Sequence, residues 1–221
     1  MAVLRFPTPQ RPRLYERPAA GRPDESPHRR GPVAGDPEES PQQMIDSEAE
    51  IRAALAAFGI DYQRWSLDRV GADASADAVL AAYANEIDEM KRRSGYVTAD
   101  VIDVNPETPG LEAMLARFDK EHTHSEDEVR FILAGRGIFF FHLQGRVASV
   151  EVGPGDMLNV PRGTFHWFTL CEERRIRAIR WFQDTSGWTP NYTDSGVDQG
   201  YQPVCFGLTY LGPRAATGLR I

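Results

Sequence analysis

Alternating apolar and polar positions dominate the chain from residue 128 onward. Short runs rich in β-branched and aromatic residues are separated by glycine-containing turns. Side chains two residues apart in an extended run share one face, so this alternation is typical of strands with one buried face. The pattern predicts a meander of hairpins that closes into a barrel. The predicted strands cover residues 128–134, 138–143, 146–152, 157–160, 165–170 and 175–182.

A helical period marks much of the chain between residues 44 and 118. Apolar residues recur at helical intervals at Ile51, Leu55 and Phe58, and Ser47 and Glu50 have the spacing of a capping box. These helices are predicted to pack outside the barrel, which makes the fold mainly β with a few helices (α+β). The predicted helices cover residues 48–58, 75–94 and 111–118, and two further strands cover 60–65 and 97–104.

The N-terminal part has neither pattern. Residues 7–43 hold nine of the sixteen prolines and few large apolar side chains, so this segment cannot bury enough surface to offset its ordering entropy. It lacks the apolar core of a secretory signal. Residues 2–6 differ, because this short β-capable run is able to pair with a sheet edge and leave 7–43 as an insertion.

These patterns divide the chain into three parts. Residues 1–43 form a mostly disordered proline- and arginine-rich segment, and residues 44–190 form one barrel domain. Residues 191–221 are rich in glycine, proline and polar residues and are expected to be a loosely structured tail. The sequence assigns no function to the N-terminal insertion or to the tail.

Composition excludes several classes of partner. With 25 basic and 32 acidic residues the net charge is −7, which repels nucleic acid and acidic membrane surfaces. No apolar run is long enough to span a bilayer. Cys171 and Cys205 are too few for a disulfide framework, so we expect reduced thiols in a cytoplasmic protein. We also expect the protein to be a monomer.

Two imidazoles and a carboxylate lie within seven residues of the chain, at His122, His124 and Glu128. All three have the same parity, so an extended segment would present them on one face. His166 follows a Pro-x-Gly turn and is a plausible fourth ligand. Three histidines and one glutamate suit Fe, Ni, Mn, Co or Zn better than Mg or Ca. The sequence alone does not select among these metals.

The spacing of these residues resembles two motifs of the cupin superfamily, whose members are small β-barrels or jelly rolls. The first motif, H-x-H-x3-E-x6-G, runs from His122 to Gly135, and the second, G-x5-P-x-G-x2-H, runs from Gly155 to His166. The general cupin pattern has glycine where this chain has Ala116. It also has asparagine where this chain has Leu170.

Within the cupins, the segments Glu121–Phe131 and Pro161–Trp167 are similar to the acireductone dioxygenase family of methionine salvage, which tolerates both departures. The resemblance implies one Fe(2+) or Ni(2+) per chain and dioxygen as co-substrate. It implies cleavage of 1,2-dihydroxy-3-keto-5-methylthiopentene to formate and 4-methylthio-2-oxobutanoate in the iron form. With nickel, the products would be methylthiopropanoate, formate and carbon monoxide.

Arg130 shares parity with Glu128, so its guanidinium also points into the predicted barrel. A buried arginine stays charged and needs an anion, which here is an acidic substrate or Glu128. In the family that the chain resembles, the matching arginine helps to form the substrate dianion. Phe168 shares a face with His166 and is a further candidate for substrate binding. The resemblance places Arg180 and Trp188 at the substrate pocket, although a plain core or surface role fits all three residues as well.

Glu121 and Asp127 flank the predicted ligands with the opposite parity. Such carboxylates often hold metal-bound imidazoles by their other nitrogen, and they are also common as solvated surface acids. His142 is interpreted as a core histidine of a barrel strand.

Two alternatives stay open. The chain could be another metal-dependent cupin enzyme, such as a different dioxygenase or an isomerase, or a ligand-sensing cupin without activity. Sensing is disfavoured because no effector domain is evident in the sequence. Thiol dioxygenases are disfavoured because their sites typically use histidines alone, whereas this set includes Glu128.

Overall fold

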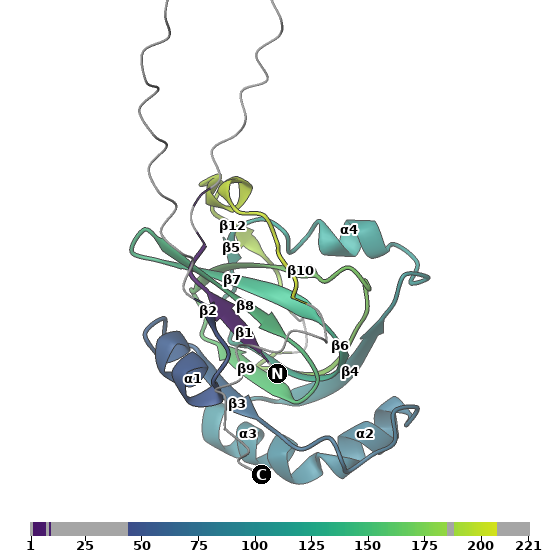
Figure 1. Ribbon diagram of the computed structural model, residues 1–221. Helices are drawn as coiled ribbons and strands as arrows, with labels where there is room; N and C mark the ends of the chain where they lie inside the picture. The colour runs from purple at the N-terminus through teal and green to yellow at the C-terminus, as the bar shows by residue number, and fades with distance from the viewer. Residues whose placement is uncertain (1, 8, 10–43, 185–187, 207–221) are drawn as a thin grey trace, which may run out of the picture.

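Two antiparallel sheets face each other in the computed structural model, which describes residues 2–7, 9, 44–184 and 188–206 (Figure 1). The seven-stranded sheet has the order β12 (Asn191–Tyr192), β5 (His122–Thr123), β10 (Phe165–Leu170), β7 (Gly137–Leu143), β8 (Arg146–Val152), β1 (Val3–Arg5) and β2 (Met44–Ile45). The five-stranded sheet has the order β3 (Asp61–Arg64), β9 (Asp156–Val160), β6 (Glu128–Gly135), β11 (Ile176–Phe182) and β4 (Thr98–Val104).

Strand alternation places the main core between the two sheets. Phe139 and Phe141 of β7 pack in one cluster with Ile132 of β6 and Leu158 of β9, and all four side chains are almost completely buried. Burial of such side chains stabilises the fold by roughly 1.5–3 kcal/mol each. The two facing sheets with a core between them confirm the expected barrel of a mainly β protein.

The helices lie outside the sheets, as expected. Val79, Tyr83 and Ile87 pack against Phe131 and Trp181 on the outer face of the five-stranded sheet (Figure 1). The helices are α1 (Glu48–Ala56), α2 (Ala76–Ala82), α3 (Ala84–Ser94) and α4 (Leu111–Leu115), with a 3-10 helix at Val197–Gly200.

Two details of the predicted helices are wrong. Ser47 precedes α1, but its side chain makes no capping hydrogen bond. The helix predicted over residues 75–94 is broken at Tyr83, whose ψ of 17° is not helical. The Tyr83 ring packs at 5.1 Å from the Phe131 ring and its hydroxyl donates to the Ser66 carbonyl. Burial of this side chain accompanies the break between α2 and α3.

The predicted meander of hairpins is wrong except between β7 and β8. β6 pairs with β9 and β11, whereas β7 pairs with β8 and β10, so the chain changes sheets from β6 to β7 and again at each step from β8 to β11. The first crossing occurs at Gly135, whose φ is +74° and where a Cβ would lie 2.0 Å from the Arg175 carbonyl oxygen. Glycine permits this conformation and this close approach.

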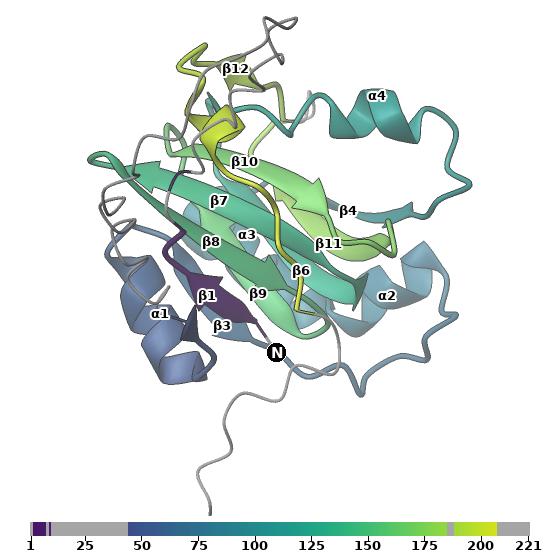
Figure 2. The ribbon, with the colours of Figure 1, turned by 45° about the horizontal axis from the view of Figure 1, so that its top comes forward.

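Both ends of the described chain pack on the barrel. Residues 3–5 form β1, which pairs with β8 as expected, and β2 then pairs with β1. The predicted disorder of residues 7–43 falls almost entirely outside the described residues. In the predicted C-terminal tail, residues 191–206 contribute β12 and the 3-10 helix and lie along the seven-stranded sheet (Figure 2).

The expectation of reduced cysteines is also wrong, because Cys171 and Cys205 form a disulfide. They are 34 residues apart in sequence and meet only because the C-terminal segment returns to the end of β10. Among the described helices, none is long and apolar enough to cross a membrane.

Candidate metal centre

Four buried side chains converge between the two sheets. His122 lies on β5 and His166 on β10, where the two residues are paired neighbours, and Glu128 begins β6 in the opposite sheet. His124 directly follows β5. One nitrogen from each histidine and one oxygen of Glu128 lie within 4.8 Å of one another, and each residue is at most 4% exposed.

The predicted ligands meet, but not because one extended segment carries them. The chain bends at residues 125–126 and passes from the seven-stranded to the five-stranded sheet before Glu128. Glu126 is buried at this bend, and its carboxylate accepts hydrogen bonds from the backbone N–H groups of Gln183 and Asp184. No pattern in the sequence indicates that Glu126 would fix this bend, and only its burial in the structure identifies that role.

Backbone carbonyl oxygens orient all three imidazoles. The Nδ1 atoms of His122, His124 and His166 lie 2.6, 2.9 and 2.8 Å from carbonyl oxygens. A carbonyl oxygen can only accept, so each Nδ1 carries the hydrogen and each neutral ring has its lone pair on Nε2. The accepting carbonyls belong to Lys120, Thr189 and Thr164, respectively.

These lone pairs point at one another and at a carboxylate. The Nε2 atoms of His122 and His124 are buried and have no hydrogen-bond partner in the described part of the chain. The Nε2 atoms of His124 and His166 lie 3.0 and 3.2 Å from a Glu128 oxygen. Burial lowers the pKa of His122 to about 4, so this ring is neutral at pH 7.

This arrangement fits a metal cation. Three imidazole lone pairs and a carboxylate repel one another when nothing lies between them, and a buried polar atom without a partner costs about 1–3 kcal/mol. A first-row divalent ion would satisfy all four donors at once. The donor set, its burial and the fixed ring tautomers are those of a metal site whose imidazoles are held from behind.

Arg130 is the counterion of Glu128. Its Nε lies 2.6 Å from the Glu128 oxygen that faces away from the histidines. Burial by itself raises the pKa of Glu128, but the neighbouring Arg130 charge outweighs it and holds the pKa well below its usual range. Glu128 is therefore ionised.

Three aromatic rings enclose the Arg130 guanidinium. Its Cζ lies 4.9 Å from the Phe168 ring centroid, 5.0 Å from that of Trp188 and 5.6 Å from that of Phe139. Such contacts favour a cation that has lost water. Among the described residues, no acceptor binds its two terminal nitrogens, which remain available to an anion.

An apolar pocket, open to solvent, lies next to the residues that surround the four ligands. Arg130 and Phe168 line it beside the metal centre, and the Phe118 ring also contacts the rings of His122 and His124. Most other lining side chains are aliphatic or thioether groups: Ile102, Val104, Met114, Leu115, Leu170 and Ile176.

The other predicted pocket residues lie nearby in different roles. Arg180 lines the pocket, but its guanidinium donates two hydrogen bonds to Asp100. The Trp188 ring stacks on the His124 ring at 6.3 Å, and its indole N–H donates to the Asp127 carbonyl. The structure thus brings both close to Arg130, whose guanidinium contacts the Trp188 ring.

Glu121 and Asp127 do not hold the ligand imidazoles, because backbone carbonyls take that place. Glu121 is buried and binds His142 Nδ1 at 2.6 Å, and it also accepts from the Thr193 and Ser195 hydroxyls. Asp127 accepts from the Arg162 backbone N–H.

His142 is not a core residue. Its side chain is 21% exposed and lies on the outer face of β7, opposite the inward-facing Phe141.

Comparison with known proteins agrees with this geometry. The ARD/ARD' family matches residues 36–190. Proteins named acireductone dioxygenase from Picosynechococcus sp. and Pseudomonas aeruginosa are 42% and 39% identical, covering 74% and 70% of this chain and 94% and 86% of theirs. A solved acireductone dioxygenase from Bacillus anthracis, with a cadmium ion in its active centre, superposes with a TM-score of 0.65 and 35% identity over 70% of this chain and 95% of that one.

Proposed function

Because this chain belongs to the ARD/ARD' family, we propose that it cleaves 1,2-dihydroxy-3-keto-5-methylthiopentene with dioxygen to formate and 4-methylthio-2-oxobutanoate. The chain is a metal-dependent enzyme of the acireductone dioxygenase kind. One observation carries the proposal. Three histidine Nε2 lone pairs and an ionised Glu128 converge in a buried space beside a pocket that contains a guanidinium with two uncommitted nitrogens.

His122, His124, Glu128 and His166 would hold one Fe(2+) or Ni(2+) ion. When bound, such an ion supplies Lewis acidity and a centre at which an electron-rich substrate and dioxygen can react. The protein contributes a His122 imidazole that is neutral at pH 7, so no proton has to leave this ring when the ion enters. Backbone carbonyls hold all three rings by Nδ1 and so leave Nε2 to the ion.

Arg130 would bind the substrate in its anionic form. The enediol of an acireductone is acidic, and a guanidinium that stays charged stabilises the anion at the atoms that lose protons. Glu128 occupies Arg130 Nε and leaves the two terminal nitrogens to face the pocket, where a planar pair of donors suits two oxygens. The enclosing Phe168 and Trp188 rings exclude water from this contact.

The apolar part of the pocket would receive the methylthioethyl chain of the substrate. Met114, Leu115 and Ile176 offer contacts to a thioether and exclude water from it. Arg180 already has a counterion in Asp100, so it does not need a substrate anion to balance its charge. It lines the pocket, and its charge lowers the pKa of Arg130. The proposal needs neither nucleic acid nor a membrane, and it takes the enzyme to be a monomer.

Metal reconstitution tests the proposal directly. Metal-free protein is loaded with Fe(2+) or with Ni(2+), and both forms receive one batch of synthetic acireductone while dioxygen uptake, headspace gas and organic acids are measured. The iron form should yield formate and 4-methylthio-2-oxobutanoate, and the nickel form methylthiopropanoate, formate and carbon monoxide. No dioxygen uptake by either form would overturn the proposal. Identical products from both forms would contradict the part of the proposal in which the metal determines the products.

A further inference from the structure

Residues 188–206, here called the closing segment, connect the metal centre to the disulfide. At its start, the Trp188 ring stacks on the His124 ring and the Thr189 carbonyl accepts from His124 Nδ1. Tyr192 on β12 pairs with His122 on β5. Most of this segment, from residue 191, lies beyond the part of the chain that matches the family. Through these contacts the closing segment positions two of the proposed ligands, His124 and His122.

The second half of the closing segment covers an apolar surface. Ile138, Phe140 and Trp167 point outward from β7 and β10, yet each is at most 3% exposed. Val197 and Tyr201 pack against this cluster, and the segment crosses the face of the sheet in Figure 2. Without the cover, these large side chains would face water, so the closing segment and the sheet are stabilised together.

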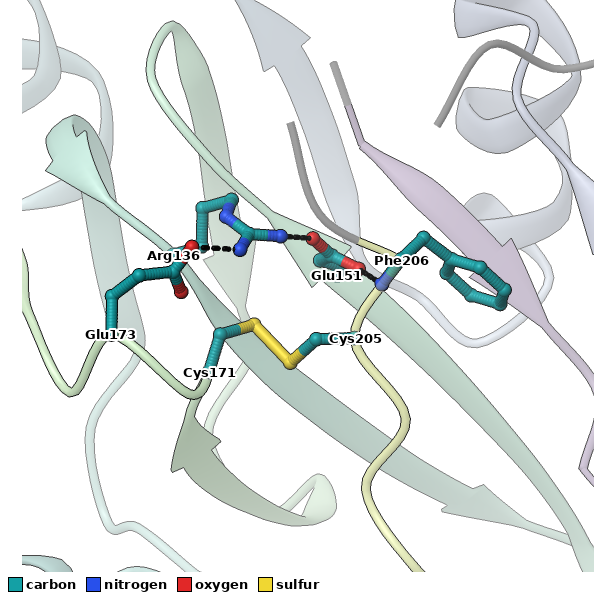
Figure 3. The surroundings of a disulfide bond; sticks show 6 residues. All are labelled: Arg136, Glu151, Cys171, Glu173, Cys205 and Phe206. Atoms are coloured by element: carbon teal, nitrogen blue, oxygen red, sulfur yellow. Dashed lines mark hydrogen bonds and ion pairs between the residues drawn. A yellow bond between two sulfur atoms is a disulfide. The ribbon is translucent and has the colours of Figure 1, made fainter. Parts of the chain in front are cut away.

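The disulfide holds the end of this cover. Cys171 follows β10 and is 1% exposed, whereas Cys205 in the closing segment is half-buried. Figure 3 shows the bond beside a row of polar groups that joins the same two parts of the chain. There Arg136 pairs with Glu151, whose other oxygen accepts from the Phe206 backbone N–H at 2.7 Å. The end of the segment thus has one covalent and one polar attachment.

We propose that the Cys171–Cys205 disulfide is a reversible thiol-exchange site that clamps the closing segment, and that its reduction by a dithiol loosens the metal centre. This deepens the proposed function, because it concerns retention of the metal by the same site. The two residues are the only cysteines in the chain, so no other protein thiol can rearrange the bond within one molecule.

The exchange begins at the accessible sulfur. One thiolate of the dithiol attacks Cys205 Sγ, the S–S bond breaks, and Cys171 leaves as a thiolate that takes up a proton. The second thiol of the reagent then attacks the mixed disulfide and releases Cys205 as a thiol. The protein gains two electrons and two protons, and the dithiol is oxidised to its disulfide. A disulfide oxidant reverses these steps.

Reduction would reach the metal centre through the backbone. With Cys205 detached, Tyr201 and Val197 lose the restraint that keeps them on Trp167 and Phe140. The segment then keeps only noncovalent attachments, among them the Phe206 N–H to Glu151 hydrogen bond, the β12 pairing and the hydrogen bonds of Thr193 and Ser195 to Glu121. Greater motion there displaces the Thr189 carbonyl, which orients the His124 ring. Loss of such an orienting partner weakens metal affinity by roughly 10–100-fold.

Hydrogen exchange tests the clamp in the full-length protein. Amide exchange of residues 191–206 is followed by mass spectrometry in the oxidised wild type, after dithiothreitol treatment and after reoxidation. We expect exchange to accelerate at least about tenfold on reduction and to recover on reoxidation. The variants Cys171→Ser and Cys205→Ser break the same bond from its two ends and should both behave like the reduced protein. The partly exposed Cys205 provides the variant that disturbs packing less.

Metal release tests the link to the site. Because dithiols bind metals, release is measured without added thiol, by chelator extraction from Ni(2+)-loaded wild type and both serine variants. Extraction should be roughly tenfold faster from the variants. Unchanged exchange of residues 191–206, or unchanged extraction despite faster exchange, would overturn the inference. A wild type that binds no Ni(2+) would contradict the proposed function, while the exchange measurement would still decide whether the clamp exists.

Discussion

Two buried glutamate–arginine pairs lie in the described part of this protein, one inside the barrel and one on its outer surface. Glu128 pairs with Arg130 between the sheets, and Glu151 pairs with Arg136 beside the disulfide. All four residues are at most 8% exposed. By burial and charge alone the two pairs look alike, and either could be taken for a functional site.

The second carboxylate oxygen distinguishes the pairs. In Glu151 it accepts from the Phe206 backbone, so the protein itself satisfies the charge. In Glu128 it faces the Nε2 atoms of His124 and His166, which have no hydrogen to donate once their Nδ1 atoms carry it. A buried charge is thus an indication of a ligand only where protein groups leave it unsatisfied.

Replacement of Glu128 by alanine should have the largest effect. It removes one proposed metal donor and leaves the Arg130 charge buried without its counterion, which destabilises the fold by about 3–5 kcal/mol. Metal content should fall below stoichiometry and activity by more than about a hundredfold, the upper range for losing an outer partner of a metal site. Metal analysis after dialysis and dioxygen uptake measure both.

Glu151→Ala is the matched control for this replacement. It should keep the metal and retain activity per folded molecule within about threefold, because it touches no proposed ligand. If Glu128→Ala kept stoichiometric metal, or Glu151→Ala lost it, the distinction between the two pairs would be wrong.

Replacement of Arg130 by lysine should give the next largest effect. A lysine keeps the positive charge but offers a point charge in place of a planar pair of donors. Metal content should stay near that of the wild type, while turnover falls by roughly a hundredfold, as for loss of one preorganised donor. Formation of the substrate dianion is followed by its absorbance under anaerobic conditions. Dianion formation like that of the wild type would remove Arg130 from this role.

Acidification of the metal-free protein should lower its stability through His122 of the inner site. The His122 pKa is lowered from 6.5 to about 4 in the folded state, so the unfolded chain binds the proton first as pH falls. Stability is therefore lost between pH 6.5 and 4, by about 3 kcal/mol at most. Denaturant titrations of wild type and His122→Gln measure the difference. An equal pH dependence of both proteins would contradict burial of a neutral His122.

The outer pair should affect stability more than chemistry. Without the Glu151 carboxylate, Arg136 keeps its contact with Glu173, but the Phe206 N–H loses its acceptor. We expect Glu151→Ala to lower the free energy of unfolding by about 2 kcal/mol. A protein of this size then melts roughly 4–8 °C lower. An unchanged melting temperature would show that water replaces the carboxylate at no cost.

The smallest effect should come from the N-terminal insertion. β1 and β2 are antiparallel neighbours with Leu4 opposite Ile45, so a short turn can replace residues 10–42. Activity should stay within about twofold, and melting should change by less than about 2 °C, because the composition of this segment predicts that it does not pack on the core. A drop of roughly six degrees or more, equivalent to about 2 kcal/mol, would show that the insertion packs against the barrel.

Local spacing was sufficient to predict much of this protein. The strand ranges follow from alternation, and the inward direction of Arg130 follows from its parity with Glu128, because side-chain direction is set within one strand. The two motifs predicted that His122, His124, Glu128 and His166 would meet. Their reason was incomplete, however, because the chain changes sheets at Glu126, between His124 and Glu128 of the first motif.

The tertiary structure decided the features that depend on distant segments. The separation of β6 from β7, the Thr189 carbonyl that orients His124 and the pairing of Cys171 with Cys205 all depend on segments that meet only when the barrel closes. No period in the sequence encodes these contacts, because each depends on the path of the chain between them. The sequence by itself determined which side chains face the interior, and the closed fold determined which of them remain unsatisfied there.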